Sequence, residues 1–185
     1  MLDKKEFRSP TLGQLGLKQV SQEILDYIHA QPKNRYKIVI GTDSESHDRV
    51  DFVSAVVVQR VGFGGRYFWQ RTFCDKMPSL RQRIYEEVNL SLILAQKVLE
   101  QLRNRLDDEI LTKGFEIHID AGQNGETREM LKEVVGMVRG NGFNVKTKPE
   151  AYCASNVADK HVWEKSKCKR QNEKTKLTKK RTVEK

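Results

Sequence analysis

Two short apolar segments that each run into an aspartate are the feature that most constrains the fold. Residues 36–41 lead into Asp43, and residues 115–119 lead into Asp120. Short apolar runs bounded by small residues predict buried β-strands. If the two strands are parallel neighbours, their carboxyl ends meet at one edge of a sheet, where open α/β sheets bind ligands. The sequence therefore predicts an α/β sheet with these two carboxylates side by side.

The remaining patterns predict the elements that bring these strands together. An apolar helical face precedes the first strand, and three glycines separate two β-rich segments that should pair as a hairpin. The two later strands each follow a helix, so right-handed crossovers should make them parallel to the first. We expect a leading helix closed by Pro32, strands at about 36–41, 50–60 and 66–74, a helix from Pro78 to about Asp107, a strand ending at Asp120, a helix at about 126–139, a strand at 143–147 and a helical segment after Tyr152.

The positive charge of the chain is concentrated at its C-terminal end. Residues 160–185 hold eleven lysines and arginines against three glutamates, so they carry +8 of the net charge of +9. A basic arm on a nearly neutral domain is typical of proteins that hold nucleic-acid phosphates. A solvated tail that only aids solubility is the alternative. We expect one domain at residues 1–161, a basic tail at 162–185, and nucleic acid as the partner.

The chain lacks the patterns of membrane and secreted proteins. No apolar run approaches the ~20 residues of a membrane span, and the N-terminus has no apolar signal stretch. The three cysteines form no C-x-x-C pair, which favours a reducing compartment without disulfides. We therefore expect a cytoplasmic protein with no membrane partner, and the sequence leaves the oligomeric state open.

A third acid is found by the phase of the long helix. At ~100° per residue, Glu87 lies in line with Ile84 and Ser91 on the flank of the apolar face, whereas Glu86 lies on the opposite, solvated side. A half-buried glutamate is costly unless a cation compensates its charge. The sequence therefore predicts that Glu87 points toward the sheet, where either a metal ion or an unplaced basic side chain offsets the cost.

The fourth acid is Asp159, which follows a run of small residues at 154–158. Small residues are expected where a helix packs tightly on a sheet. His161 follows two residues later, on a different helical face. Near a carboxylate cluster it could shuttle protons, although a surface or structural histidine is the ordinary alternative. Crowded carboxylates share a proton or a cation, and hard oxygen ligands suit Mg²⁺ or Mn²⁺.

Taken together, these motifs resemble the bacterial ribonuclease-H-like proteins of the YkuK type. The resemblance covers about residues 10–161. It implies a ribonuclease-H-like fold, a mixed five-stranded sheet with flanking helices, here with an extra N-terminal helix and the basic tail. It also implies an acidic metal centre. The motifs that carry it are Ile40–Ser44, Glu87, Glu116–Asp120, Lys148–Tyr152 and Val157–Lys160.

The mechanism that we infer is two-metal hydrolysis of phosphodiester bonds in RNA or RNA/DNA hybrid, in preference to DNA. Asp43 would bridge both ions, Glu87 and Asp120 would complete one shell, and Asp159 the other. His161 completes the candidate catalytic set. Four arginines are candidates for phosphate contacts, with ordinary surface charge as the alternative: Arg66, Arg71, Arg81 and Arg83.

Three alternatives remain open at this point. Glu45 follows Asp43 by two residues, and such an Asp-x-Glu motif resembles the opening motif of DEDD-type exonucleases. That class also has a His or Tyr a few residues before its last aspartate, whereas Tyr152 precedes Asp159 by seven. The second alternative is a nucleic-acid-binding module without hydrolysis, because the fold alone proves no activity. The third is a structural domain of a larger assembly.

Overall fold

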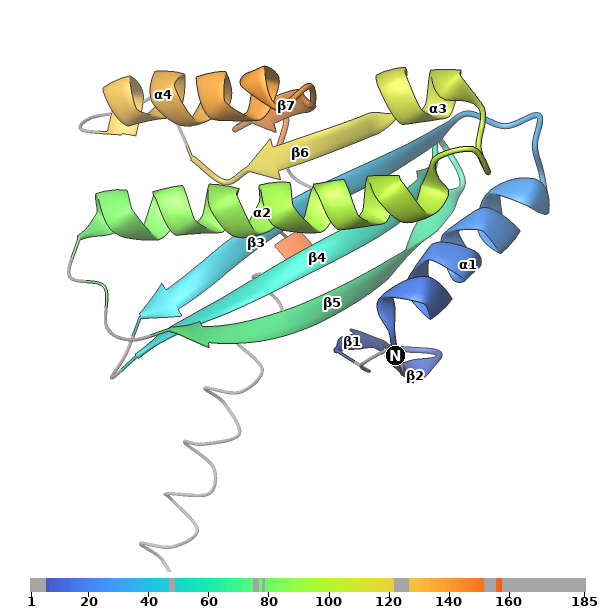
Figure 1. The fold of residues 1–185 in the computed structure, drawn as a ribbon, viewed down its shortest axis with the longest axis horizontal. Helices are drawn as coiled ribbons and strands as arrows, with labels where there is room; N and C mark the ends of the chain where they lie inside the picture. The colour runs from blue at the N-terminus through green and yellow to red at the C-terminus, as the bar shows by residue number, and fades with distance from the viewer. Residues whose placement is uncertain are drawn as a thin grey trace, which may run out of the picture.

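The protein is built on a seven-stranded mixed β-sheet, as the computed structural model shows (Figure 1). The structure describes residues 6–46, 49–74, 77, 79–121, 127–151 and 156–157. The strands are β1 (Phe7–Ser9), β2 (Gly13–Leu15), β3 (Tyr36–Ser46), β4 (Val50–Arg60), β5 (Gly64–Cys74), β6 (Phe115–Ile119) and β7 (Asn144–Thr147). The helices are α1 (Leu17–His29), α2 (Leu80–Leu102), α3 (Asp108–Lys113) and α4 (Thr127–Gly140).

Five of the strands follow the topology predicted from the sequence. β3, β4 and β5 form an antiparallel meander, and β6 and β7 add to the other side of β3 as parallel strands. The full order is β2-β1-β5-β4-β3-β6-β7. Helix α2 lies between β5 and β6, and α4 between β6 and β7, as parallel connections require. β3 is therefore central, and its carboxyl end lies on the same side as that of β6.

Strand β3 is longer than the sequence pattern indicated. It continues to Ser46 because β4 pairs with it along its whole length, with Asp43 opposite Val53. The parallel pairing with β6 stops earlier, at Ile40 opposite Ile117. The expectation that the strand ends before Asp43 was therefore wrong: this residue lies inside β3, beyond the point where β6 separates from it.

The sequence patterns gave no indication of two elements at the edges of the fold. A hairpin of β1 and β2 joins the free edge of β5 through Arg8 opposite Trp69, which raises the strand count from five to seven. The long helix ends at Leu102, and the separate helix α3 follows. Between them Asn104 adopts a left-handed φ of 65°, which asparagine tolerates better than most residues. Three-residue strands and a six-residue helix carry too little periodicity to be recognised.

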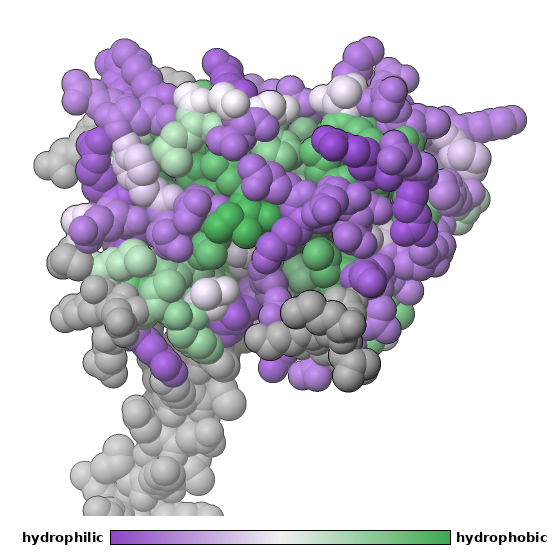
Figure 2. Space-filling model, viewed as in Figure 1, coloured by the Kyte–Doolittle hydropathy of each residue, from purple (hydrophilic) through white to green (hydrophobic). Residues whose placement is uncertain are grey.

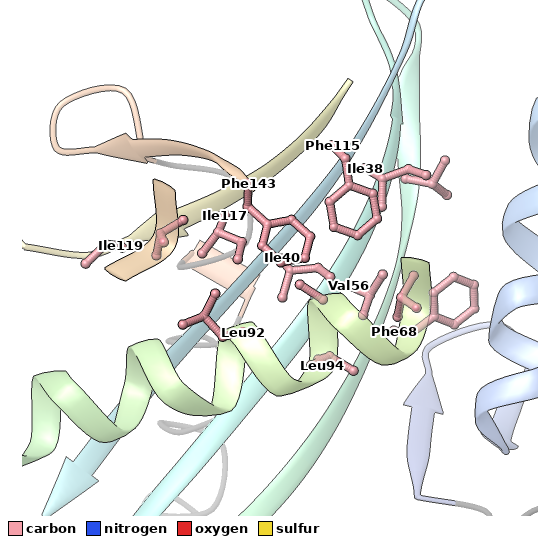
Figure 3. Packing of buried hydrophobic residues seen from close by; sticks show 14 of the residues in the cluster. Ile38, Ile40, Val56, Phe68, Leu92, Leu94, Phe115, Ile117, Ile119 and Phe143 are labelled. Carbon is pink, nitrogen blue, oxygen red and sulfur yellow. The ribbon is translucent and has the colours of Figure 1, made fainter. Parts of the chain in front are cut away.

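The main hydrophobic core lies between one face of the sheet and helices α1, α2 and α4. Alternate residues of β3 and β6 supply this helical face of the sheet, and they pack against Leu92 and Leu94 of α2 (Figure 3). The labelled residues of the sheet and its connections are Ile38, Ile40, Val56, Phe68, Phe115, Ile117, Ile119 and Phe143. Burial of this apolar surface is the main favourable term for folding.

The other face of the sheet, here called the opposite face, carries a smaller apolar cluster. Its members are Val39, Val53, Ala55, Val57 and Trp69, with Val157 packed against them. Seen from the helical side, the surface is mostly hydrophilic with a few hydrophobic patches between the polar side chains (Figure 2). Within the described parts of the chain, no helix has both the length and the apolar character that crossing a bilayer demands.

Candidate metal centre

Even-numbered residues near the end of β3 meet helix α2. Thr42 is buried, and its hydroxyl lies 2.9 Å from that of Ser54 on β4 and 2.9 Å from that of Ser91 on α2. Two residues later, the hydroxyl of Ser44 donates a hydrogen bond of 2.6 Å to Oε1 of Glu87. Buried hydroxyls require partners of this kind. This chain of hydroxyls anchors α2 to β3 and sets the position of Glu87.

Glu87 points toward the sheet, as the helix phase predicted. Its neighbour Glu86 instead contacts Asn89 on the same helix, 3.4 Å away. Burial raises the pKa of Glu87 to about 8, and the charges of Asp43 and Asp120 raise it further, while the bond from Ser44 and the charge of Arg83 act against them. Without metal, Glu87 is therefore protonated at neutral pH, and burial contributes more to this than like-charge repulsion does.

Asp43 lies on β3, and Asp120 is the first residue after β6. Three residues beyond the last pair of the β3–β6 ladder, Ile40 and Ile117, the chains reach these two aspartates. Because side chains alternate along a strand, Asp43 projects on the opposite face of the sheet from Ser44. Asp120 follows Ile119, the last residue of β6, whose side chain belongs to the helical side. Glu45 shares the face with Asp43 by the same alternation.

A lysine already neutralises Asp120. Nζ of Lys148, one residue beyond β7, contacts Oδ1 of Asp120 as an ion pair, without the alignment of a hydrogen bond. This extends the β6–β7 register, in which Ile119 lies opposite Thr147. Sequence reasoning did not assign this role to Lys148. The ammonium group occupies the position of a cation beside the carboxylate, so a metal ion at Asp120 would compete with it.

The structure brings three of the predicted site residues to one end of the sheet, but it does not join them into a ligand cage. Among the residues that the structure describes, no three His, Cys, Asp or Glu side chains are arranged to hold a metal ion. Glu87 approaches from α2 and contacts Ser44 on the helical face, whereas Asp43 projects on the opposite face by the alternation of β3. Asp159 and His161 lie outside the described residues, so their roles stay predictions.

Sequence reasoning missed a largely buried ionic network around Glu116 and His118 of β6, which lie on the opposite face of the sheet. Glu116 binds Nζ of Lys37 at 2.9 Å and Nε2 of His118 at 3.2 Å. Burial opposes the charge on Glu116, but the hydrogen bonds from Lys37 and His118 outweigh it and lower the pKa of this carboxyl. Burial lowers the pKa of His118, so its ring is neutral at neutral pH.

This network lines a cavity of about 370 Å³ together with Lys146 and Glu150. Lys146 and Glu150 form their own ion pair of 2.5 Å. The signal in the sequence was the spacing of Glu116 and His118, which places both on one side of a strand whose other side is apolar. Glu116 precedes Asp120 by four residues, or ~13 Å along a strand. The network of Glu116 and His118 is therefore a separate feature of the sheet and does not contact Asp120.

Three of the four candidate phosphate-binding arginines already have acidic partners within the fold. The pairs are Arg66 with Glu23, Arg71 with Asp51 and Arg81 with Glu133. Exposed pairs of this kind add little stability and open easily. The side chain of Arg71 is largely buried, so its charge compensates that of Asp51 within the sheet and is not available to a phosphate. Arg83 differs from the others, because its charge acts on Glu87.

Comparison with known proteins decides the family. The sequence profile described as "Ribonuclease H-like" matches residues 19–162. The chain belongs to the ribonuclease H-like family. It is also 27% identical over 169 residues to the "Uncharacterized protein YkuK" of Bacillus subtilis (strain 168), an alignment that covers 86% of this chain and 98% of that protein. No solved structure matches the chain. Membership of the ribonuclease H-like family accounts for the observed sheet and suggests a function on nucleic acids.

Proposed function

We propose that this ribonuclease H-like protein is a divalent-metal-dependent nuclease that hydrolyses phosphodiester bonds in RNA or in RNA/DNA hybrid. One observation carries the proposal: the charges of Asp43 and Asp120, at one end of the sheet, both act on Glu87. A structural role would not require three acids at one place, and negative charge beside a phosphate weakens simple binding. The acids make sense if a cation comes between them and the phosphate.

The donor chemistry fits Mg²⁺ or Mn²⁺, which prefer carboxylate oxygens. Such ions would activate a water molecule and stabilise the leaving oxygen of the phosphodiester. Asp43 and Asp120 would hold them, together with Glu87 after it loses its proton and Asp159 from the segment after β7. Lys148 keeps Asp120 neutralised in the metal-free protein. His161 would move a proton near this centre.

A second candidate function is supported by one further observation. Glu45 lies on the same strand face as Asp43, two residues further along β3. An Asp-x-Glu pair on one face can contribute two carboxylates to the same centre, as in the DEDD-like exonuclease alternative. Glu45 would then replace Glu87 as the third ligand. The two candidates differ in which glutamate is essential, and they share both aspartates.

The basic tail supports nucleic acid as the partner in either case. Its net charge of +8, counted from residue 160, suits the phosphate backbone, whose neutralisation makes binding depend on salt. Residues 162–185 lie outside the described residues, so this part of the proposal rests on charge alone.

The experiment that tests the proposal compares cleavage of four labelled substrates with Mg²⁺ or Mn²⁺: single-stranded RNA, duplex RNA, RNA/DNA hybrid and DNA. Changes in groups that only surround a metal cost about 10- to 100-fold in activity, so Asp43→Asn should cost more. Glu86→Gln is the matched control and should retain activity. Loss of activity in Glu87→Gln favours the ribonuclease-H centre, and loss in Glu45→Gln favours the exonuclease-like centre.

Two results would contradict the proposal. Cleavage that persists in Asp43→Asn at the wild-type rate would trace the activity to a contaminant or to another site. Tight binding of RNA with no cleavage of any substrate would favour the non-catalytic binding module.

A further inference from the structure

The cavity of about 370 Å³ on the opposite face of the sheet has no part in the proposed metal centre. Its walls come from strands β3, β4, β6 and β7 and from the turn after β7: Lys37, Val39, Gln59, Glu116, His118, Lys146, Pro149 and Glu150. Its volume lies within the range of small-ligand sites, and polar groups that converge on such a space are typical of them. The cavity is therefore a candidate binding site.

Two polar side chains form the buried wall of this cavity. The side chain of Glu116 is 9% exposed and that of His118 is 4% exposed. Strands buried on both faces of a sheet are usually apolar on both. A buried ion pair is often no more stabilising than apolar side chains of similar volume. Stability therefore does not explain why Glu116 and His118 lie at this place, whereas a polar ligand in the cavity does.

The ion pairs around the cavity leave hydrogen-bonding positions for a ligand. Glu116 binds Lys37 through one oxygen and His118 through the other, but a carboxylate offers about four acceptor positions. The ammonium group of Lys37 likewise has more donors than its bond to Glu116 uses. Lys146 and its partner Glu150 are 40% and 64% exposed, so this pair opens easily. The cavity thus offers a buried acceptor and two ammonium groups nearer the solvent.

We propose that this cavity binds the ribose–phosphate unit of a ribonucleotide, with the ribose 2′-hydroxyl donating to Glu116 and the phosphate between Lys37 and Lys146. An acidic side chain is a common acceptor for the hydroxyls of a ribose, and lysine is a common phosphate ligand. Val39 and Pro149 supply apolar surface for the sugar or base. The unit belongs either to a free nucleotide or to an RNA chain.

The register of β7 links the cavity to the proposed centre. Lys146 lies opposite His118, and Lys148, two residues further, contacts Asp120. The chain from Lys146 to Lys148 therefore leads from the cavity to the centre, over the ~13 Å that separate Glu116 from Asp120 along the strand direction. For an RNA chain the inference rests on the proposed nuclease function, and it makes RNA the substrate in preference to DNA, because the 2′-hydroxyl distinguishes the two.

The test compares ribose and 2′-deoxyribose probes in EDTA, so that cleavage consumes neither. The probes are adenosine 5′-monophosphate and a short single-stranded RNA of mixed sequence, each beside its deoxy counterpart. A hydrogen bond to a charged group corresponds to about 12- to 150-fold in affinity, so the wild type should prefer the ribose probe by this factor in at least one pair. Glu116→Gln forms only a neutral hydrogen bond, so the preference should fall to about 2- to 12-fold.

Lys146→Ala tests the phosphate contact at an exposed position, independently of any effect of Glu116→Gln on folding. It should weaken binding of ribose and deoxyribose probes alike, and it should lower the salt slope of RNA binding by about 0.7. Lys113→Ala is the matched control, because Lys113 also pairs with a glutamate four residues away, Glu109, and is 79% exposed. It should leave both quantities unchanged. An equal effect of the two lysine variants would show a general effect of charge and overturn the assignment.

The outcomes separate the cavity site from the nuclease proposal. Equal affinity for ribose and deoxyribose probes, a preference that Glu116→Gln leaves intact, or no binding of any probe overturns the cavity site, and Asp43-dependent cleavage with Mn²⁺ still decides the nuclease. A preference that depends on Glu116, in a protein that cleaves nothing, supports the cavity site and rejects the nuclease. Preference in the mononucleotide pair assigns the site to a free nucleotide, and preference in the RNA pair alone assigns it to the chain.

Discussion

Replacing Glu87 with glutamine should stabilise the metal-free protein at neutral pH. Burial and the two aspartates raise the pKa of Glu87 from 4.5 to about 8. In the unfolded chain the carboxyl loses its proton near its ordinary pKa, whereas in the folded protein it keeps the proton. Between these values the unfolded state binds fewer protons, so stability falls as pH rises. Below pH 4.5 and above pH 8 this group contributes no slope.

The magnitude follows from the distance between the two pKa values. Each pH unit above 4.5 costs ~1.36 kcal/mol, so at pH 7 the penalty reaches about 3 kcal/mol. A glutamine at position 87 is neutral in both states, and its amide oxygen can still accept the hydrogen bond from Ser44. For a chain of this size, ~2–4 °C per kcal/mol converts the gain into a rise in Tm of about 6–12 °C.

The assay is urea unfolding in EDTA at intervals from pH 5 to pH 9, with Glu86→Gln as control for loss of a negative charge on the same helix turn. The wild type and Glu86→Gln should lose stability from pH 5 to pH 8, and Glu87→Gln should show a flatter profile. Mn²⁺ should stabilise the wild type more at pH 8 than at pH 6, because binding requires the ionised carboxylate. A Glu87→Gln protein no more stable than wild type at pH 7 would falsify the reasoning.

Three further changes probe other parts of the centre and the tail. Lys148→Ala removes the cation beside Asp120, so it should lower metal-free stability and tighten Mn²⁺ binding in calorimetry; unchanged Mn²⁺ affinity would contradict competition between the lysine and the metal. Ser91→Ala breaks a buried hydroxyl contact with Thr42 and should cost ~1 kcal/mol in urea unfolding, and a neutral effect would mean that the contact is dispensable. Deleting residues 163–185 removes ten cations and should lower the salt dependence of RNA binding, because each neutralised phosphate of a single strand adds ~0.7 to the slope; an unchanged slope would reduce the tail to a solubility feature.

Local patterns were sufficient for much of the central architecture. Apolar runs predicted strands β3 and β6, and glycines predicted the turn between β4 and β5. The predicted start of the long helix at Pro78 lies two residues before the start of α2, where the Ser79 hydroxyl accepts a bond from the Gln82 backbone. The period of α2 also separated Glu87 from Glu86 correctly. These signals are short-range, because periodicity and capping depend on neighbours within a few residues.

Short-range signals could not predict how Asp43 and Asp120 are placed relative to their neighbours in the fold. The sequence placed Asp43 and Asp120 at strand ends, but it could not show that Asp43 remains in a paired strand or that Lys148 reaches Asp120. The position of the lysine depends on β7 joining β6 after a helical crossover. The acidic partners of three arginines likewise come from other elements: those of Arg66, Arg71 and Arg81. Contacts between residues far apart in the chain leave no periodic trace in either segment.

The sequence by itself determined the order of the central elements, the inward phase of Glu87 and the basic C-terminal end, since each depends on local periodicity or on charge alone. Only the tertiary structure decided on which face each acid lies and which cation it meets. The pairing of β3 with β4 and with β6 sets these relations, and one residue of register would exchange the two faces. The protonated state of Glu87 also depends on the fold, because burial and the charges of two aspartates raise its pKa against the effect of the hydrogen bond from Ser44.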